Sequence, residues 1–281
     1  QAYVGGLGVG LVCLIFDQNV VGFLVTILAI LGSVIFGAIW GIIPGYLQAK
    51  RGSHIVITTI MFNFIAAALM VYLLVNVIIE PGQMSPETRD FASGVGLVQI
   101  HILAKYLGLD MAMSPLNLSF IVALAVSVGF WFLVWRTKFG YEVSSLGHSE
   151  TAAIYAGIKV SSTIIIVMAI SGGLAGLVAI NELLGVHNKL LLGFTAGYGF
   201  TGIAVALMGR NHPFGIFLAS LLFGALYQGG TELDFEFSSI TREMVLLIQG
   251  LIILFSGALA YMLNPLVERI YIKYYGNYNN A

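Results

Sequence analysis

Several amide and carboxyl side chains lie inside otherwise apolar stretches of this sequence. They are Asn63, Asn181, Glu182, Gln228 and Gln249, with His187 at the edge of one stretch. A neutral amide donates and accepts hydrogen bonds without a counter-charge, so it can bind a hydroxyl-rich solute. The aromatic rings nearest to these amides in the sequence could form apolar walls or stack on a planar ring; they are Phe62, Phe64, Tyr198 and Phe200. The alternative role for each amide is a hydrogen bond between neighbouring helices, worth about 0.6 kcal/mol.

No pattern of a catalytic centre accompanies these residues. The sequence has no GxxxxGK[ST] phosphate loop, no HExxH pair and no serine or cysteine in a triad context. Residues 197–202 match GxGxxG, but a dinucleotide site requires a preceding strand in a βαβ unit. Their glycines fit an interrupted helix or close helix packing equally well. The single cysteine, Cys13, excludes an internal disulfide and a cysteine-based zinc site. We expect no catalytic residue, cofactor or metal in this chain.

The composition indicates that the chain is surrounded by hydrocarbon. Of its 281 residues, 59% are apolar and only 9% are charged, and the mean hydropathy is +0.96. Soluble domains carry roughly 25% charged residues, and so few charges cannot cover the surface of a 30.2 kDa globule. The net charge of −1 provides no basic surface for nucleic acid.

Charge-poor stretches long enough to cross a bilayer recur along the chain. A membrane helix needs about 20 residues, and backbone groups in lipid must be paired within helices or closed barrels. No period-two alternation typical of a barrel is present. We predict an all-α, polytopic membrane protein that forms one domain over residues 1–281. Its eight predicted spans are 1–16, 20–46, 54–79, 115–135, 161–184, 190–209, 213–230 and 242–263.

The basic residues assign the sides of the membrane. Lys and Arg collect in cytoplasmic loops, and eight of the 12 fall on one side of the predicted spans. These eight are Lys50, Arg51, Arg136, Lys138, Lys159, Arg210, Arg269 and Lys273. This side is therefore predicted to be cytoplasmic, with both ends of the chain on it. Two of the connecting loops are long. In the outer loop, residues 80–114, we expect a helix within 95–107 that lies on the membrane. In the cytoplasmic loop, residues 136–160, we expect a short helix that ends at Gly157.

Four segments carry a resemblance to a known family. They are LGHSETAAIYAGIKV at 146–160, SGGLAG at 171–176, GFTGIAVALMGRNHPFG at 199–215 and TTIMFNFI at 58–65. Together they resemble the permeases of the branched-chain amino acid and simple-sugar branch of ABC importers, and the last two resemble the nucleoside-type subgroup. The resemblance covers residues 40–260. It departs from the family at His54, where an acidic residue is common, and it suggests that further N-terminal helices precede this chain.

The resemblance implies the partners and the mechanism. Family members are permeases of bacterial cytoplasmic membranes that import a nucleoside or a simple sugar. They pair with a second permease subunit, a cytoplasmic ATPase that binds ATP and Mg²⁺, and an extracytoplasmic solute-binding lipoprotein. The cytoplasmic loop would transmit movement from the ATPase, through Gly147, His148, Ser149, Glu150, Ala152, Ala153, Tyr155 and Gly157. The predicted translocation pathway comprises Phe62, Asn63, Asn181, Tyr198, Phe200 and Gln228.

Other functions make different demands on the sequence. An ion-coupled secondary transporter needs carboxylates within the membrane or a broken-helix ion site, and only Glu182 is a candidate. A membrane-embedded enzyme needs His, Asp or Glu clustered at one membrane face, and no such cluster is evident. The outer loop and the acidic stretch 231–237 could dock a binding protein. Ordinary solvated loops explain them equally well.

Overall fold

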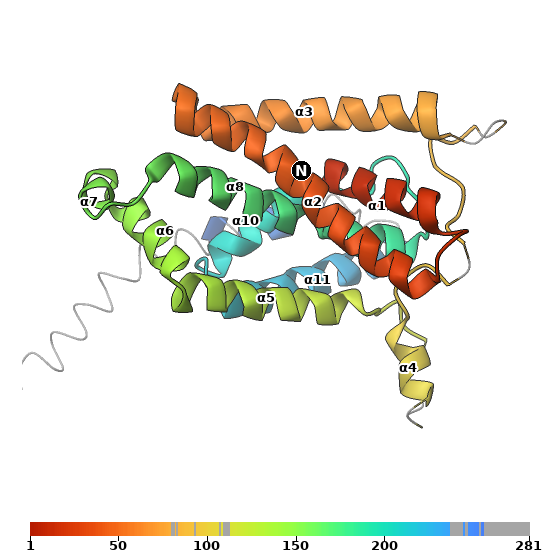
Figure 1. Ribbon diagram of the computed structural model, residues 1–281. Coiled ribbons are helices and arrows are strands. Elements are labelled where there is room, and N and C mark those ends of the chain that lie inside the picture. The colour runs from red at the N-terminus through yellow and green to blue at the C-terminus, as the bar shows by residue number, and fades with distance from the viewer. Residues whose placement is uncertain are drawn as a thin grey trace, which may run out of the picture. The chain divides into compact units, whose positions relative to one another are not determined.

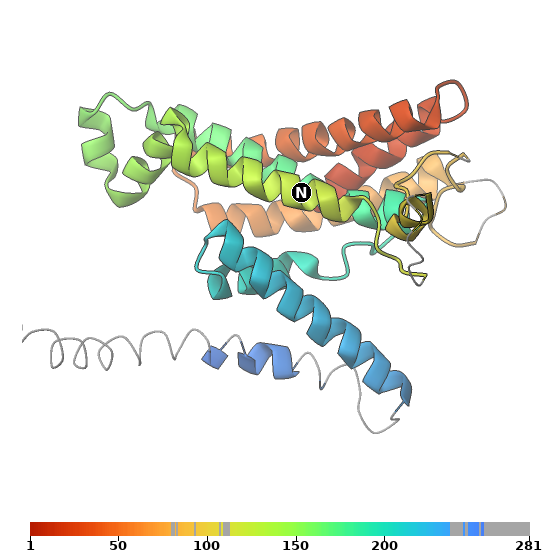
Figure 2. The same ribbon diagram turned by 90° about the horizontal axis from the view of Figure 1, so that it is seen from below.

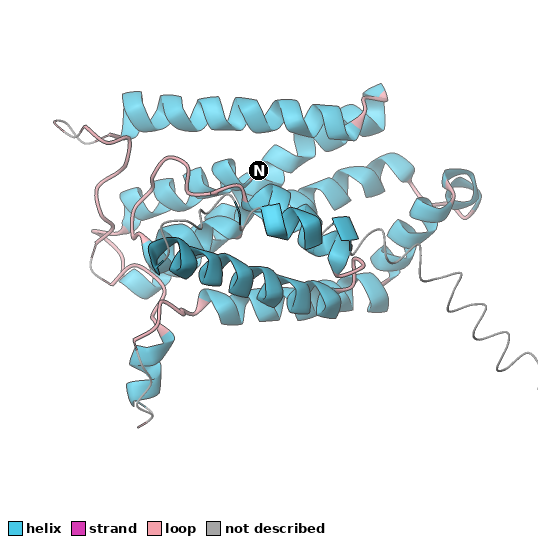
Figure 3. Cartoon of the chain, turned by 180° about the vertical axis from the view of Figure 1, so that it is seen from behind, coloured by secondary structure: helices cyan, strands magenta, loops and turns pink. Residues whose placement is uncertain are grey.

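The computed structural model describes residues 1–79, 82, 84–92, 94–106, 108, 113–236, 244, 247–252 and 254–255. Within these residues every regular element is a helix (Figure 3), and the two β-bridges are isolated. In this described part of the chain, five helical stretches are long and apolar enough to cross a membrane. They are Gly22–Arg51, Ile55–Ile78, Ser119–Arg136, Val160–Val186 and Pro213–Leu233. The predicted all-α class is confirmed for the described part of the chain.

Contacts divide the chain into two units, residues 1–196 and 197–281. Unit 1 contains α1 (Ala2–Phe16), α2 (Gly22–Arg51), α3 (Ile55–Leu73), η1 (Leu74–Ile78), α4 (Ile100–Tyr106), α5 (Ser119–Arg136), α6 (Lys138–His148), α7 (Glu150–Tyr155), α8 (Val160–Gly176), α9 (Val178–Ile180) and η2 (Asn181–Val186). Unit 2 contains α10 (Tyr198–Met208) and α11 (Pro213–Glu236). The π-helix η1 continues α3, and α9 and η2 continue α8 into one span.

The most extensive helix–helix contact among the described residues of unit 1 joins α2 to α8. Small residues recur every four positions on α2, at Ser33, Gly37, Gly41 and Gly45, and on α8 at Gly172 and Gly176. Gly37 contacts Gly172 and Ser33 contacts Gly176, so the two helices run antiparallel with their backbones touching. Small residues spaced four apart lie on one face of a helix, where they let two helix backbones approach closely. In lipid this close packing drives helix association, because the hydrophobic effect does not. Gly172 and Gly176 therefore serve helix packing, and the helix they pack against is α2.

Helix α1 is enclosed by the rest of unit 1. Gly5 of α1 contacts Gly176, and Gly8 contacts Gly32. Gly6 and Gly10 lie against the side chains of Phe194 and Leu190. Glycines on both faces therefore let α1 sit against α2 and α8 on one side and the 190–194 segment on the other. Figure 1 shows α1 beside α2, with α4 running across the direction of the long helices at one end.

Two long apolar helices of unit 1 are hardly covered. Helix α5 has no buried residue, and α3 buries only Ala66 and Met70. Since both helices are apolar along their length, their surfaces require lipid or another apolar surface rather than water. This pattern fits a chain embedded in a membrane.

Helices α10 and α11 of unit 2 form a helical hairpin. Its core is Val205 of α10 with Ala219 and Phe223 of α11, the longer blue helix in Figure 2. The turn between the helices places Arg210 and Asn211 at φ 52° and 55°, a region that asparagine tolerates better than most residues. Proline at the first position of α11 is compatible with a helix start, because its missing N–H would be unpaired there.

Most predicted spans coincide with observed helices, but two require comment. The predicted span 190–209 is not one helix: residues 192–197 form turns, and α10 has only 11 residues, about 16 Å of rise. Gly193 and Gly197 take φ values of 78° and 81° in these turns, whereas Gly199 and Gly202 lie inside α10. The predicted span 242–263 lies largely outside the described residues. In the loop 136–160 the structure has two helices, α6 and α7, where one was expected.

Candidate functional site

The predicted pathway residues on α3 have contrasting surroundings. The ring of Phe62 is partly buried and meets Trp40 of α2 edge to face, with 5.6 Å between centroids and 71° between planes. Asn63 is exposed, and its amide has no hydrogen-bond partner among the described residues. An exposed amide within a helix of this apolarity needs a partner beyond unit 1. Asn63 can therefore bind a polar group that approaches α3 from outside.

Asn181, by contrast, is engaged inside unit 1. Its Oδ1 accepts hydrogen bonds from Asn117 Nδ2 at 3.1 Å and from Ser119 Oγ at 2.8 Å. Its Nδ2 donates to Glu182 Oε1 at 3.2 Å, and Glu182 lies 3.8 Å from His187. These bonds tie the start of α5 to the π-helix η2. They match the alternative role considered for each amide, a hydrogen bond between helices.

The remaining predicted pathway residues belong to unit 2. Tyr198 and Phe200 are on the first turn of α10, with 37% and 74% of their surface exposed. Gln228 on α11 is exposed and donates a hydrogen bond to Glu232 at 3.1 Å. Phe62 and Asn63 are adjacent on α3, and Tyr198 and Phe200 are both in the first turn of α10.

Local signals define the helices of the loop 136–160. Thr137 caps α6 by accepting a hydrogen bond from Gly140 N, and Ser149 caps α7 by accepting one from Ala152 N. Gly140 has no room for a side chain because it abuts the backbone of Val134, which makes the turn from α5 tight. Gly157 has φ 80° just after α7, as expected for a glycine that ends a helix.

Helix α7 presents an apolar surface to its exterior. Ala153 is buried against unit 1, whereas Ile154 and Tyr155 are 59% and 89% exposed, and Ala152 is also exposed. His148 bonds its own helix through Nδ1 and Ser144 O, and Gly147 and Glu150 are exposed. Exposed large apolar side chains beside small ones are typical of a surface that contacts another protein.

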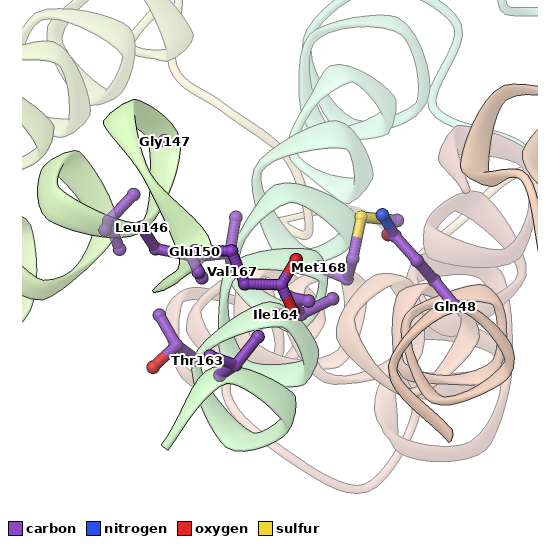
Figure 4. Close-up of a pocket in the computed structure, with 10 residues that line it drawn as sticks. Gln48, Leu146, Gly147, Glu150, Thr163, Ile164, Val167 and Met168 are labelled. Atoms are coloured by element: carbon purple, nitrogen blue, oxygen red, sulfur yellow. The ribbon is translucent and has the colours of Figure 1, made fainter. Parts of the chain in front are cut away.

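Cavities lie between the α6–α7 pair and the long helices. One, of about 340 Å³, is lined by Gln48 of α2, residues of α6 and the first turns of α8. Figure 4 shows Gln48 opposite Leu146, with Val167 and Met168 between them. A second, of about 770 Å³, shares Gln48 and has Lys50 and Lys159 at its wall. Figure 2 shows α6 and α7, in green, at one end of unit 1 beyond the end of α5. The pair is therefore joined to the bundle without dense packing.

An ion pair holds the opposite end of unit 1 together. Asp17, between α1 and α2, is completely buried and accepts two hydrogen bonds from Arg89, at 2.7 and 2.9 Å. It also accepts one from Ala92 N at 3.0 Å, while Arg89 bonds Leu14 O at 3.3 Å. A bidentate pair with further hydrogen bonds offsets the cost of burying the carboxylate. The segment after residue 84 is thereby attached to α1.

The same segment is bonded to the chain that follows η2. Thr88 N donates to Leu190 O, and Leu190 N donates to Thr88 Oγ1. Lys189 lies 3.0 Å from Glu87, and the Phe91 side chain enters the main core. The described residues 84–92 and 94–97 therefore cover this end of unit 1.

We expect the Asp17–Arg89 pair to make the free energy of unfolding depend on pH in the acidic range. Hydrogen bonding from Arg89 holds the pKa of the Asp17 carboxyl below its ordinary 3.8, although burial acts in the opposite direction. Because the folded pKa is the lower one, the stabilisation is complete above 3.8 and is lost as pH falls through the folded value. Asp17→Asn should cost about 2 kcal/mol at neutral pH, measured by thermal unfolding in detergent. The deficit relative to wild type should shrink below pH 3.8.

Glu142→Gln provides the matched control for this prediction. Its partner Lys138 is 91% exposed and 3.9 Å away, and an exposed pair of this kind contributes little. Its unfolding temperature should equal that of wild type at neutral pH. A deficit in Asp17→Asn that stayed constant from neutral pH to well below 3.8 would contradict the proposed linkage.

Sequence reasoning missed several of these residues. Trp40 was not predicted as a neighbour of Phe62, and Asn117 was not predicted as a partner of Asn181. Asp17 and Arg89 were visible only as charges in two loops, 72 residues apart. No local pattern pairs them, since each contact depends on the path of the backbone.

Comparison with known proteins gives a consistent match. The family model described as branched-chain amino acid transport system / permease component matches residues 1–257. The guanosine ABC transporter permease of Bacillus subtilis is 34% identical over 246 residues, or 86% of this chain and 68% of the relative. The glucose ABC transporter permease of Haloferax volcanii is 31% identical over 234 residues, 81% of this chain and 60% of the relative.

A nucleoside ABC transporter permease of Lactococcus lactis is 31% identical over 229 residues, 81% of this chain and 62% of the relative. A second guanosine permease of B. subtilis and a second nucleoside permease of L. lactis also match. The chain thus spans between 60% and 68% of the length of the first three relatives. No solved structure matches it significantly.

Proposed function

The chain belongs to the family of permease components of branched-chain amino acid transport systems, and from this premise we propose that it is the membrane-embedded permease subunit of an ABC importer. The match over residues 1–257 is the observation that carries the proposal. The apolar helices agree with it, because a permease must place most of its surface in lipid.

The proposed solute is a nucleoside or a simple sugar. Five of the relatives are named for guanosine, nucleosides, glucose, allose and ribose, and another for riboflavin. These solutes are neutral and rich in hydrogen-bonding groups, so amides such as Asn63 and Gln228 suit them better than charged side chains would. Phe62, Asn181, Tyr198 and Phe200 complete the proposed pathway, with Asn181 acting through the hydrogen bonds that join α5 to η2.

The proposed partners are a second permease, an ATPase and a solute-binding lipoprotein. B. subtilis and L. lactis each contribute two different matching permeases, which supports pairing with a related chain. ATP and Mg²⁺ would bind the ATPase, and this chain would hold no cofactor. The exposed apolar surface of α7 supports a role for residues 147–157 in contact with that ATPase. The cavities behind the α6–α7 pair would allow it to tilt when the ATPase closes.

We further propose the finer topology. The α6–α7 end would face the cytoplasm of a bacterial inner membrane, as would both ends of the chain, because Lys50, Arg136 and Lys159 lie there. The chain would form one permease domain with eight spans. The turns at 192–197 would interrupt the sixth span near membrane depth, where backbone groups can meet water or solute.

Uptake by reconstituted complexes tests this function. The chain would be purified with its partner subunits, placed in liposomes, and supplied with radiolabelled nucleoside and the binding protein. We expect uptake that requires ATP and solute that stimulates ATP hydrolysis. Uptake that persists without the ATPase but stops when the ion gradient is dissipated would instead identify a secondary transporter.

Asn63→Leu should lower uptake about tenfold, because a lost solute hydrogen bond is worth about 1.4 kcal/mol. The amount of folded protein should not change, since Asn63 is exposed and makes no bond within the described chain. Asn76→Leu is the matched control: Asn76 is also exposed on this span, but its amide donates to Tyr72 O at 3.0 Å. Normal uptake by Asn63→Leu would remove Asn63 from the pathway.

A further inference from the structure

Two buried side-chain polar atoms lack a hydrogen-bond partner within the described residues, Trp40 Nε1 and Ser53 Oγ. Ser53 lies in the turn between α2 and α3, near the end of the bundle. Trp40 lies on α2, eleven residues before its last residue Arg51, which corresponds to about 16 Å along the helix. Water at the end of the bundle cannot readily reach the indole at that depth.

An unpaired donor of this kind calls for a physical explanation. The indole N–H can only donate, and a donor hidden from water without an acceptor costs free energy. Packing alone does not require it, because a phenyl ring would occupy the same face of α2 without the N–H. The cost is explained if the N–H meets an acceptor in another state of the protein.

The surroundings of Trp40 indicate what that acceptor is. Its ring meets Phe62, and the next residue on α3 is Asn63, whose exposed amide has no partner among the described residues. Trp40, Phe62 and Asn63 therefore place an N–H donor, two aromatic rings and an amide near one position along α2 and α3. A heteroaromatic base has flat faces for stacking and ring atoms that accept hydrogen bonds. A simple sugar has the hydrogen-bonding groups but no aromatic face.

We infer that Trp40 is a specificity-determining residue of the pathway, whose indole N–H donates to the base of a nucleoside during passage. The inference rests on the proposed importer function and narrows its solute to nucleosides. In the present structure the N–H is covered, so Phe62 or its helix must shift before the solute reaches it. Trp40 and Phe62 thus act as an aromatic pair that the base separates.

Trp40→Phe tests this role, because it keeps a ring against Phe62 and removes only the donor. In reconstituted complexes, kcat/KM for uptake of a radiolabelled purine nucleoside should fall about tenfold. The amount of folded protein and its unfolding temperature should be no lower than those of wild type, because the variant removes a buried donor that has no acceptor. Trp135→Phe, the same substitution at an exposed position on α5, should leave nucleoside uptake unchanged.

Trp40→Leu separates a packing role from a solute-binding role. If Trp40 only packs, Trp40→Phe transports nucleosides normally and Trp40→Leu lowers the amount of folded protein, which overturns the inference. ATP-dependent uptake of a monosaccharide without any nucleoside uptake also overturns it, while the importer function stands. Absence of ATP-dependent uptake for every nucleoside and monosaccharide tested would refute the proposed function and the inference together.

Discussion

Replacing Gly172 by leucine should remove at least about 90% of the folded protein from membranes. A side chain at this position would enter the backbone of α2 at Gly37, so the two helices could pack only by separating. Overpacking a core by a few carbons costs about 1–3 kcal/mol when side chains can adjust, and here the obstacle is backbone. Since total stability is about 5–15 kcal/mol, the variant should misassemble. Fluorescence-detected size exclusion of detergent extracts would measure the loss.

Gly129→Leu is the matched control for that experiment. Gly129 is in the middle of α5, and a side chain added there meets no atom within 4 Å. Its folded yield should stay close to that of wild type. Equal yields of Gly172→Leu and wild type would mean that α2 and α8 are not in backbone contact.

Replacing Tyr155 by serine should lower solute uptake at least about tenfold while leaving the protein folded. Tyr155 is 89% exposed on α7, so unit 1 loses almost no packing when it is removed. In the proposed importer its ring enters the ATPase, and buried aromatic anchors commonly carry 2 kcal/mol or more of an interface. The measurements are uptake and solute-stimulated ATP hydrolysis in liposomes. ATP hydrolysis should no longer respond to solute.

Tyr155→Phe is the control because it keeps the ring and removes only the hydroxyl. This variant should retain most of the uptake of wild type. Normal coupling in Tyr155→Ser would exclude α7 as the site of force transfer. A fall in both variants together with a lower folded yield would indicate a structural role for the residue instead.

Much of the helical organisation could be predicted from the sequence, because long apolar stretches and basic loops are local properties. Five apolar helical stretches of the described chain begin close to the start of a predicted span: Gly22–Arg51, Ile55–Ile78, Ser119–Arg136, Val160–Val186 and Pro213–Leu233. The predicted helix boundaries were wrong where glycines favour turns over helix, as at residues 192–197. A second helix in the 136–160 loop was missed because α6 is rich in polar residues and carries no membrane-span pattern.

The sequence suggests which residue types a solute pathway would use, but it does not give the contacts that those residues make. The amide of Asn63 stood out because an amide in an apolar helix is costly, and its exposure agrees with a role toward a solute. Asn181 stood out for the same reason, yet its partners Asn117 and Ser119 are more than 60 residues away. Residue type alone cannot distinguish an amide that is available to bind a solute from one that forms a hydrogen bond between two helices.

By itself, the sequence determined that most of this protein faces lipid and that it is helical. It also determined the position of the long loop, residues 136–160, that contains α7. Those properties follow from how many apolar residues stand in a row and where charges interrupt them. The tertiary structure alone decided that Gly37 touches Gly172, that Asp17 binds Arg89 and that Trp40 faces Phe62. Such contacts join distant parts of the chain, so they depend on helix directions and on the path of the backbone, which no local pattern specifies.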